Sequence, residues 1–396
     1  MHDQSSLRAV LIDCIPPDMS KEEAAFRMSE AKSLVSTYGG VVLVASYQRR
    51  MHPHYRTYIG PGKAEEILAE AKHAGANILI VNNELKPGQV YNLSELYRPA
   101  KVDVWDRIDL ILKIFQKHAS TKEAQLEIEL ASVRHMGPRI YGMGIELSRQ
   151  GGGIGTRGEG ETNTEKMKRH LAAQEDKIRA QLAECQKTRS LAMHSRRRKN
   201  FRTIGIIGYT NAGKSTLLNA LTKKGAYAAD KLFATLDTRV GKLYLPETQT
   251  EVLLSDTIGF IQDLPHTLIN SFQSTLAETK DADMLLHVID ANDPRLGMKI
   301  EVVRDVLEHI GVPKIPIIYV FNKADALDPE TKQKAAELLQ EESPLFVSAL
   351  TGEGLHALKS RIAEVNKGLY SGERTASRTR ELNSLKLPGR RRFPLR

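Results

Sequence analysis

Cysteine is scarce in this sequence, since among 396 residues only Cys14 and Cys185 occur, far apart along the chain. Two such cysteines exclude a disulfide framework and give no metal-ligand spacing, which makes a reducing compartment the default. No apolar run approaches the ~18 residues that span a membrane, and the start, MHDQSSLRAV, lacks the basic-then-apolar pattern of a secretion signal. We therefore expect a cytoplasmic protein without a membrane span, and the sequence leaves a peripheral association with the membrane open.

Positive charge, in contrast, is abundant and unevenly placed. The formal net charge is +9, and residues 374–396 contribute +7 of it through eight basic residues against the single acid Glu381. A second basic cluster, RRRKNFR, spans 196–202. A single basic cluster is plain solvated surface as often as it is a binding site. Two such clusters favour a polyanionic partner, nucleic acid above all.

The pattern of apolar residues divides the chain into four segments. The first and third alternate β-rich runs with helical patterns, as parallel α/β sheets do. For the third we expect a doubly wound, mostly parallel sheet with helices on both faces. The second segment carries helical patterns only, and the fourth is basic and poor in apolar residues. The segments are residues 1–118, 119–200, 201–372 and 373–396.

The second segment predicts a helical hairpin. Two stretches, 120–136 and 165–199, place apolar residues at near-heptad spacing with charged residues between them. Between them, RQGGGIGTRGEGET at 149–162 holds six glycines. Because glycine disfavours helix, we expect a flexible loop over 149–162 at one end of the hairpin.

The third segment contains the G-x-x-x-x-G-K-S pattern, GYTNAGKS at 208–215, between a predicted strand and a predicted helix. The backbone N–H groups of such a loop, the P-loop, wrap a diphosphate, and the helix N-terminus adds a favourable dipole. Lys214 would reach the β- and γ-phosphates, and the Ser215 hydroxyl would bind Mg²⁺.

A second motif, DTIGF at 256–260, ends another predicted strand. Asp256 would hold the magnesium shell through water, and the Gly259 N–H can approach the γ-phosphate because no side chain blocks it. The residue after this glycine is frequently a Gln that orients the attacking water. Phe260 stands there instead, and a phenyl ring cannot hydrogen-bond water, which predicts slow intrinsic hydrolysis.

A third motif, NKAD at 322–325, selects the base. An ionised carboxylate only accepts hydrogen bonds, so Asp325 can take both N1–H and N2–H of guanine, and adenine lacks these donors. Asn322 would tie this loop to the P-loop, and the Lys323 stem would cover the base. In SAL at 348–350, the Ala349 N–H suits guanine O6.

The segment FATLDTR at 233–239 offers two candidates for a further magnesium ligand, Thr235 and Thr238, of which Thr235 fits better by order and spacing. We assign catalysis to Lys214, Thr235 and Gly259, and Mg²⁺ binding to Ser215 and Thr235, with Asp256 acting through water. The predicted GTP site comprises Gly208, Tyr209, Thr210, Asn211, Ala212, Gly213, Lys214, Ser215, Thr216, Phe233, Thr235, Asp256, Gly259, Asn322, Lys323, Asp325, Ser348, Ala349 and Leu350.

These motifs, in this order, resemble the GTPases of the translation-factor class. IGPGKAEEI (59–67), GGGIGTRGEGET (151–162) and FATLDTR narrow the resemblance to the HflX family, over about residues 7–370. The resemblance implies an N-terminal α/β domain, a hairpin linker and a GTPase domain, with Mg²⁺ as cofactor. It also implies a monomer that binds the large ribosomal subunit and splits or rescues stalled ribosomes.

By the same resemblance, the hairpin and its glycine-rich loop would approach ribosomal RNA, with Arg149, Arg157 and Lys166 as candidate phosphate contacts. After GEGET the sequence departs from the usual family pattern, and a basic tail stands where many members carry a small folded domain. The family's reported adenine-nucleotide activity could involve GPGK (60–63) and GGGIGTRGEG (151–160), which equally suit turns or RNA contacts.

With Phe260 in the usual Gln position, three routes to an oriented water remain: backbone groups of neighbouring loops, the ribosome, or a monovalent cation. Asn211 marks the third route, because several GTPases with this apolar substitution bind K⁺ through that P-loop position.

Two other function classes remain open from the sequence. A GTPase that partners an RNA- or tRNA-modification enzyme would be expected to carry a reactive cysteine near its C-terminus, and the last 200 residues contain none. A ribosome-bound scaffold would use its nucleotide site only as a switch, without catalysis.

Overall fold

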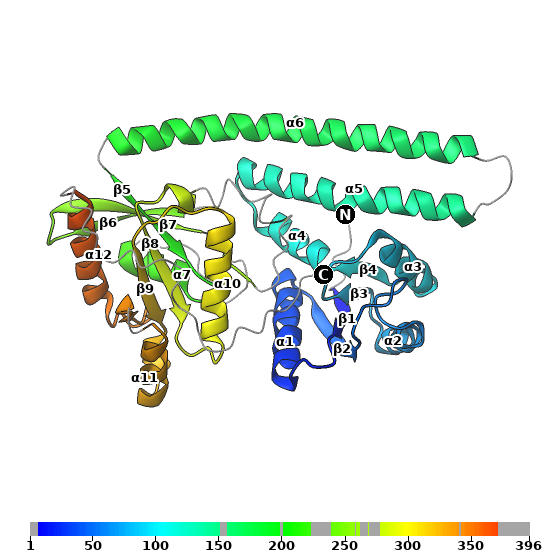
Figure 1. Ribbon diagram of the computed structural model, residues 1–396, viewed down its shortest axis with the longest axis horizontal. Helices are drawn as coiled ribbons and strands as arrows, with labels where there is room; N and C mark the ends of the chain where they lie inside the picture. Colours follow the sequence, from blue (N-terminus) through cyan, green and yellow to red (C-terminus); the bar gives the residue numbers. More distant parts are fainter. Residues whose placement is uncertain are drawn as a thin grey trace.

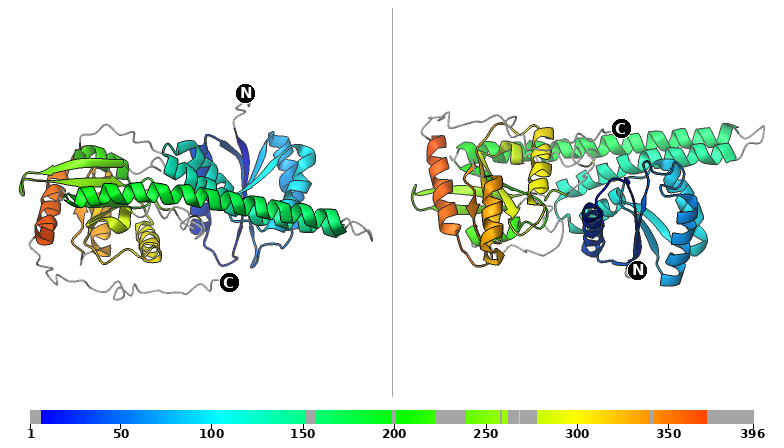
Figure 2. Two further views of the ribbon diagram at one scale, coloured as in Figure 1. Left: turned by 90° about the horizontal axis from the view of Figure 1, so that it is seen from above. Right: turned by 60° about the horizontal axis from the view of Figure 1, so that its bottom comes forward.

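The computed structural model describes residues 7–150, 157–198, 201–222, 239–257, 259–261, 268, 278–339 and 342–370. Two α/β units lie side by side, and a long helical hairpin runs across both of them (Figure 1; Figure 2). We call residues 7–118 the N-terminal unit and residues 201–370 the C-terminal unit. Within the described ranges, no helix is long and apolar enough to cross a membrane.

The N-terminal unit is a four-stranded, wholly parallel sheet in the order β2-β1-β3-β4, which confirms the predicted α/β architecture. Alternate residues of the central strands face opposite sides. Leu11 and Ile80 pack against α1 and α4, whereas Ile12 and Val81 pack against α2 and α3. The elements are β1 (Arg8–Ile15), α1 (Lys21–Tyr38), β2 (Val41–Arg49), α2 (Pro61–Ala74), β3 (Ile78–Val81), α3 (Pro87–Tyr97), η1 (Arg98–Ala100), β4 (Asp103–Asp106) and α4 (Arg107–His118).

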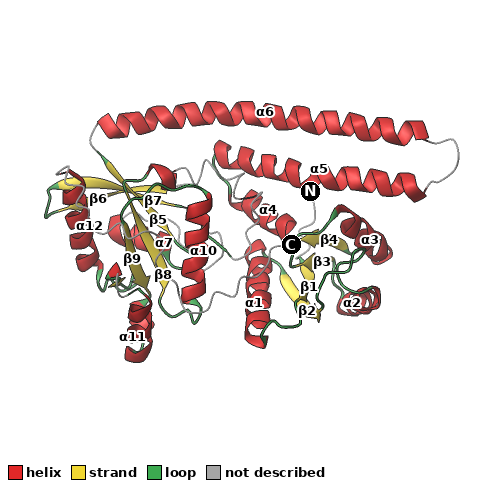
Figure 3. Ribbon diagram, in the orientation of Figure 1, coloured by secondary structure: helices red, strands yellow, loops and turns green. Residues whose placement is uncertain are grey.

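The C-terminal unit is a six-stranded sheet in the order β10-β9-β8-β5-β7-β6, with helices on both faces (Figure 3). All its pairs are parallel except the antiparallel pair β6–β7, so the predicted doubly wound, mostly parallel sheet is confirmed. The elements are β5 (Arg202–Ile207), α7 (Lys214–Thr222), β6 (Arg239–Leu245), β7 (Thr250–Asp256), β8 (Met284–Asp290), α10 (Leu296–His309), β9 (Ile317–Asn322), η2 (Ala324–Ala326), α11 (Pro329–Leu338), β10 (Leu345–Phe346) and α12 (Leu355–Tyr370).

The predicted hairpin is present as α5 (Lys122–Gln150) and α6 (Arg157–Arg198). Its seam is a small apolar cluster of Leu126, Leu130, Ile178 and Leu182. The predicted loop over 149–162 is wrong at both ends, because α5 continues to Gln150 and α6 begins at Arg157 despite its glycines. Glycine costs a helix only about 1 kcal/mol relative to alanine, so flanking helix can carry it.

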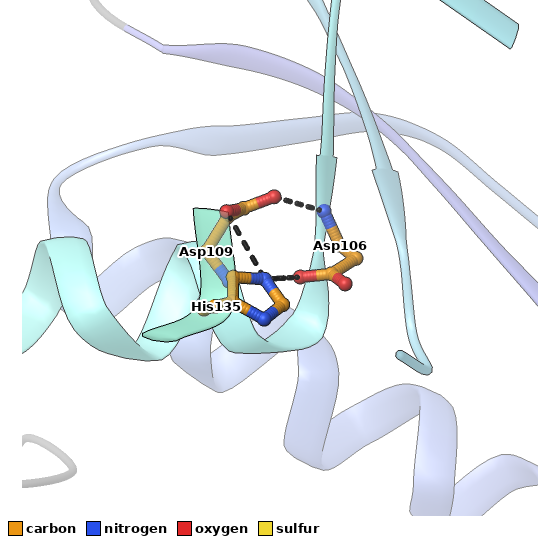
Figure 4. A group of neighbouring side chains, drawn as sticks. All are labelled: Asp106, Asp109 and His135. Atoms are coloured by element: carbon orange, nitrogen blue, oxygen red, sulfur yellow. Dashed lines mark hydrogen bonds and ion pairs between the residues drawn. The ribbon is translucent and has the colours of Figure 1, made fainter. Parts of the chain in front are cut away.

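An ion cluster joins α5 to the carboxyl edge of the N-terminal sheet (Figure 4). Asp106 ends β4 and caps α4 reciprocally with Asp109. His135 Nε2 of α5 lies 3.3 Å from Asp106 Oδ1 and 3.4 Å from Asp109 Oδ1. Arg139, one turn further along α5, donates to Asp106 and, at 2.7 Å, to Asp109 Oδ2.

Two carboxylates and an imidazole this close could hold a metal ion, but their charges are already balanced. Burial on its own lowers the pKa of His135, and the hydrogen bonds to Asp106 and Asp109 outweigh it and raise the pKa to about 9. A protonated imidazole has no lone pair for a metal. With Arg139, it offsets both carboxylates, so we interpret the group as a structural joint between the hairpin and the N-terminal unit.

Because of this ion cluster, we expect the free energy of unfolding to depend on pH. Because the folded pKa of His135 lies above its ordinary value of 6.5, the stabilisation is complete below about pH 6.5 and is lost as pH rises through about 9. We expect His135→Gln to lower the free energy of unfolding by about 1–3 kcal/mol near pH 6. The deficit should shrink towards pH 10, as measured by denaturant unfolding.

The exposed His170 of α6 provides the control, since His170→Gln should leave stability unchanged at both pH values. A deficit for His135→Gln that is the same near pH 6 and pH 10 would contradict a charged His135.

Candidate nucleotide site

The P-loop leaves β5 at Ile207 and enters α7 at Lys214, at the carboxyl edge of the C-terminal sheet. Two of its glycines are required by close approach. Gly208 has φ of 150°, and a Cβ there would lie 2.2 Å from the Val288 carbonyl oxygen. Gly213 has φ of 90°, and a Cβ there would lie 2.1 Å from Asn322 Nδ2. The loop therefore packs directly on β8 and on the NKAD segment, which fixes its curved backbone.

The predicted phosphate and magnesium groups lie together. Lys214 is 7% exposed, and its Nζ donates to the Tyr209 carbonyl oxygen over 2.9 Å. Burial lowers the pKa of Lys214 to about 8, while the Asp256 carboxylate opposes the shift. Ser215 Oγ donates to Asp256 Oδ2 over 2.6 Å. A hydroxyl next to a buried carboxylate is a donor set of hard oxygen atoms, which suits Mg²⁺.

Some of the predicted site residues cannot be placed in the same way. Phe233 and Thr235 lie outside the described residues. Thr216 follows Ser215 in the first turn of α7, where its backbone can face a phosphate. A Cβ at Gly259 would lie 3.0 Å from the Thr210 Cα and 2.8 Å from Lys214 Nζ, so a side chain here would crowd the P-loop.

Phe260 has a role that the sequence did not suggest. Its carbonyl accepts from the Thr210 N–H over 2.7 Å, and its own N–H donates to the Gly208 carbonyl over 3.2 Å. These bonds form a parallel β-bridge between the P-loop and the DTIGF segment. The ring is 1% exposed and packs with Ile207, Leu285 and Val303 under α10. Phe260 therefore points into the core and fastens the γ-phosphate segment to the P-loop.

The NKAD loop is joined to its neighbours through Asn322. Its Nδ2 donates to the Ala212 carbonyl over 2.9 Å, and its Oδ1 accepts from the Ala349 N–H over 3.0 Å. The Ala349 N–H assigned to guanine O6 is thus already engaged, so the base would have to share it. Lys323 has φ of 63°, and its Nζ lies 2.6 Å from Asp290 Oδ2. No sequence motif predicted this ion pair.

The remaining base-recognition residues border the same edge. Asp325 is exposed in η2, which leaves its carboxylate accessible to a base. Ser348 is buried and its hydroxyl oxygen accepts from the Thr351 N–H over 3.1 Å. Leu350, in the same SAL segment as Ser348, is 82% exposed, so its side chain is accessible.

The candidate RNA contacts lie on the hairpin, away from this edge. Arg149 lies in the last turn of α5 and Arg157 begins α6, but their side chains are outside the described part of the chain. Lys166 lies on α6 and is exposed.

A P-loop, a buried Asp256 beside Ser215, and an NKAD loop joined to the P-loop through Asn322 define a guanine-nucleotide-binding P-loop protein. Comparisons with known proteins narrow this class. Three family models match consecutive parts of the chain: GTP-binding GTPase N-terminal over residues 25–116, GTP-binding GTPase Middle Region over 118–196, and 50S ribosome-binding GTPase over 203–323.

Individual relatives agree with these models. The chain is 41% identical over 390 residues to GTPase HflX of Caldanaerobacter subterraneus subsp. tengcongensis, covering 97% of this chain and 87% of that protein. It is 40% identical over 337 residues to GTPase HflX of Escherichia coli strain K12, covering 85% and 78%. A crystal structure of SsGBP with GDP is 26% identical, covers 91% of this chain and 99% of its own, and has a TM-score of 0.52. The chain belongs to the HflX family, and it is a GTP-hydrolysing enzyme.

The buried position of Phe260 predicts that Gln there will not accelerate hydrolysis. Phe260→Gln would put an amide into a packed core and should lower the free energy of unfolding by about 3 kcal/mol or more. We expect GTP turnover of the isolated protein to be unchanged or slower, as followed by phosphate release together with denaturant unfolding.

Tyr244→Gln is the control, because Tyr244 is 55% exposed on β6, and it should change neither quantity. Faster turnover of Phe260→Gln at unchanged stability would show instead that this side chain can reach the attacking water.

Proposed function

We propose that this GTPase binds the large ribosomal subunit through its helical hairpin and uses GTP to split or rescue stalled ribosomes. The observation that carries the proposal is the match of residues 203–323 to the model of a 50S ribosome-binding GTPase, within a chain that belongs to the HflX family. The binding partner would be ribosomal RNA. The protein would act as a monomer in the cytoplasm.

The surface of α6 supports an RNA partner. This helix runs from Arg157 to Arg198, and the end of the hairpin extends beyond the N-terminal unit (Figure 1). Lysine and arginine side chains along it would face RNA phosphates and release their counterions. The exposed basic residues on its described part include Lys166, Lys168, Arg169, Lys177, Arg179 and Lys187.

Hydrolysis would be carried by the groups around the P-loop. Lys214 would stabilise the charge of the β- and γ-phosphates, and the Gly259 N–H would donate to the γ-phosphate. Ser215 would hold Mg²⁺ directly, with Thr235 as the expected further ligand and Asp256 acting through water. Bound there, Mg²⁺ would neutralise the negative charge that develops between the two phosphates.

The orientation of the attacking water is not explained by the side chains that the structure describes at the site. Because the Phe260 ring is buried in the core, it does not orient water. Asn211, exposed in the P-loop at φ of 64°, would help to hold K⁺ against the phosphates, and the cation would supply charge where other GTPases use an arginine. The ribosome would order the neighbouring loops and thereby start the reaction.

Ribosome association is expected to depend on the nucleotide and on the hairpin. In sedimentation with purified large subunits, binding should be strongest with a non-hydrolysable GTP analogue and weaker with GDP. Lys166→Glu should weaken binding several-fold and make it less sensitive to salt, because it removes a phosphate contact.

The control is Lys334→Glu on α11, whose side chain is 69% exposed and lies on the C-terminal unit. Equal binding with all nucleotides would contradict the proposed function. Equal weakening by both charge reversals would contradict a specific role for the hairpin.

Potassium dependence is testable apart from ribosome binding. We expect GTP turnover to be faster in KCl than in NaCl at equal ionic strength, and Asn211→Ala to abolish the difference. Turnover measured with and without large subunits decides the matter, since equal rates in both salts under both conditions would exclude the cation.

A further inference from the structure

The N-terminal unit reaches the P-loop through a buried polar contact between Glu30 and Tyr209. The Tyr209 hydroxyl, in the P-loop, donates to Oε2 of Glu30 on α1. Tyr209 is 5% exposed and Glu30 is 8% exposed, so water does not compete for the contact. Arg107, the first residue of α4, donates to the other Glu30 oxygen over 2.5 Å and to Asn82 Oδ1 over 2.6 Å. Glu30 is therefore held by the N-terminal unit and presents its second oxygen to Tyr209.

Further contacts surround this one, where α1 and α10 face each other (Figure 1). Lys299 Nζ of α10 lies 4.5 Å from the centroid of the Tyr209 ring and 5.6 Å from that of Phe26 on α1. The Arg295 guanidinium lies 4.3 Å from the Phe26 centroid. The Tyr209 ring and Ile261 belong to the same core cluster as the inner faces of α1 and α4. The N-terminal unit thus contacts Tyr209 and also Ile261, the residue that follows the bridge partner Phe260.

The backbone of Tyr209 carries two features of the nucleotide site. Its carbonyl oxygen accepts from Lys214 Nζ. Its neighbours Gly208 and Thr210 make the bridge to Phe260, and Gly259 precedes that bridge. A shift of Tyr209 would therefore move the lysine and the γ-phosphate segment together.

A cavity of about 70 Å³ adjoins the P-loop on the side that faces α10, lined by Thr210, His287 and Ile300 among others. Lys299 lines the same cavity, so the polar contacts of Tyr209 lie at its wall.

We infer that Glu30 is a positioning residue for the GTP site: through the Tyr209 hydroxyl it holds the P-loop in the shape that accepts a diphosphate. Nucleotide affinity then depends on the docking of the N-terminal unit on the P-loop. By linkage, a bound nucleotide must stabilise that docking to the same extent. The inference concerns the isolated GTPase and does not depend on the ribosome.

The test is a double-mutant cycle on the full chain. Tyr209→Phe removes the hydroxyl but keeps the ring, and Glu30→Gln replaces the charged acceptor by a neutral one. Each should weaken the binding of GDP and of a non-hydrolysable GTP analogue by about three- to tenfold. The double variant should be little weaker than either single variant, because both remove the same interaction.

Glu22→Gln on α1 and Tyr244→Phe on β6 are the matched controls, because both side chains are exposed, and neither should alter affinity. Affinities that are unchanged or tighter in folded Tyr209→Phe would overturn the inference, and so would additive effects in the cycle. Should Glu30→Gln fail to fold because Arg107 loses its partner charge, Tyr209→Phe decides the matter, since it leaves the pair of Glu30 and Arg107 intact.

Hydrogen exchange supplies a readout that a merely structural contact would not move. GDP should slow amide exchange in α1 of the unaltered protein, and Tyr209→Phe should abolish that slowing. Equal slowing in both proteins would show that the nucleotide reaches α1 by another route, and the inference would be wrong.

Discussion

The P-loop backbone is fixed by groups from three different parts of the fold. The DTIGF segment holds it through the two backbone hydrogen bonds of Phe260. The NKAD loop holds it through the Asn322 amide on the Ala212 carbonyl. The N-terminal unit holds it through Glu30 and the Tyr209 hydroxyl. A diphosphate binds to the N–H groups of this loop, so the shape set by these three contacts decides whether the N–H groups converge.

The meeting of the motifs at one edge of a sheet was predictable from the sequence. GYTNAGKS follows a strand, DTIGF and NKAD begin at the last residues of two others, and the carboxyl ends of such strands meet at one edge. Ser215 accordingly contacts Asp256, and Asn322 contacts the P-loop at Ala212. The strands themselves were predictable because each is a short apolar run between helical patterns.

Two features could not be predicted from the sequence: contacts between residues that are distant along the chain, and the direction in which a single side chain points. Glu30 looks like any acid on an amphipathic helix, and it lies 179 positions from Tyr209. Phe260 suggested a missing Gln, but its ring turns into the core while its backbone remains at the site. His135 lies 29 positions from Asp106, so no short sequence motif could predict that they form an ion cluster. The glycines at 158 and 160 predicted loop, yet α6 includes them.

The connections between the three parts bear on how a partner at the hairpin, such as the ribosome proposed above, would act on the nucleotide site. The hairpin is coupled to the P-loop by two routes. The first is covalent, because α6 ends at Arg198 and β5, which leads into the P-loop, begins at Arg202. The second runs from α5 through the ion cluster of His135 to the N-terminal unit, and from there through Glu30 to Tyr209. In the proposed function, a ribosome bound to the hairpin would reach the P-loop through both routes, and it would help to complete a site whose described side chains include none that orients the attacking water.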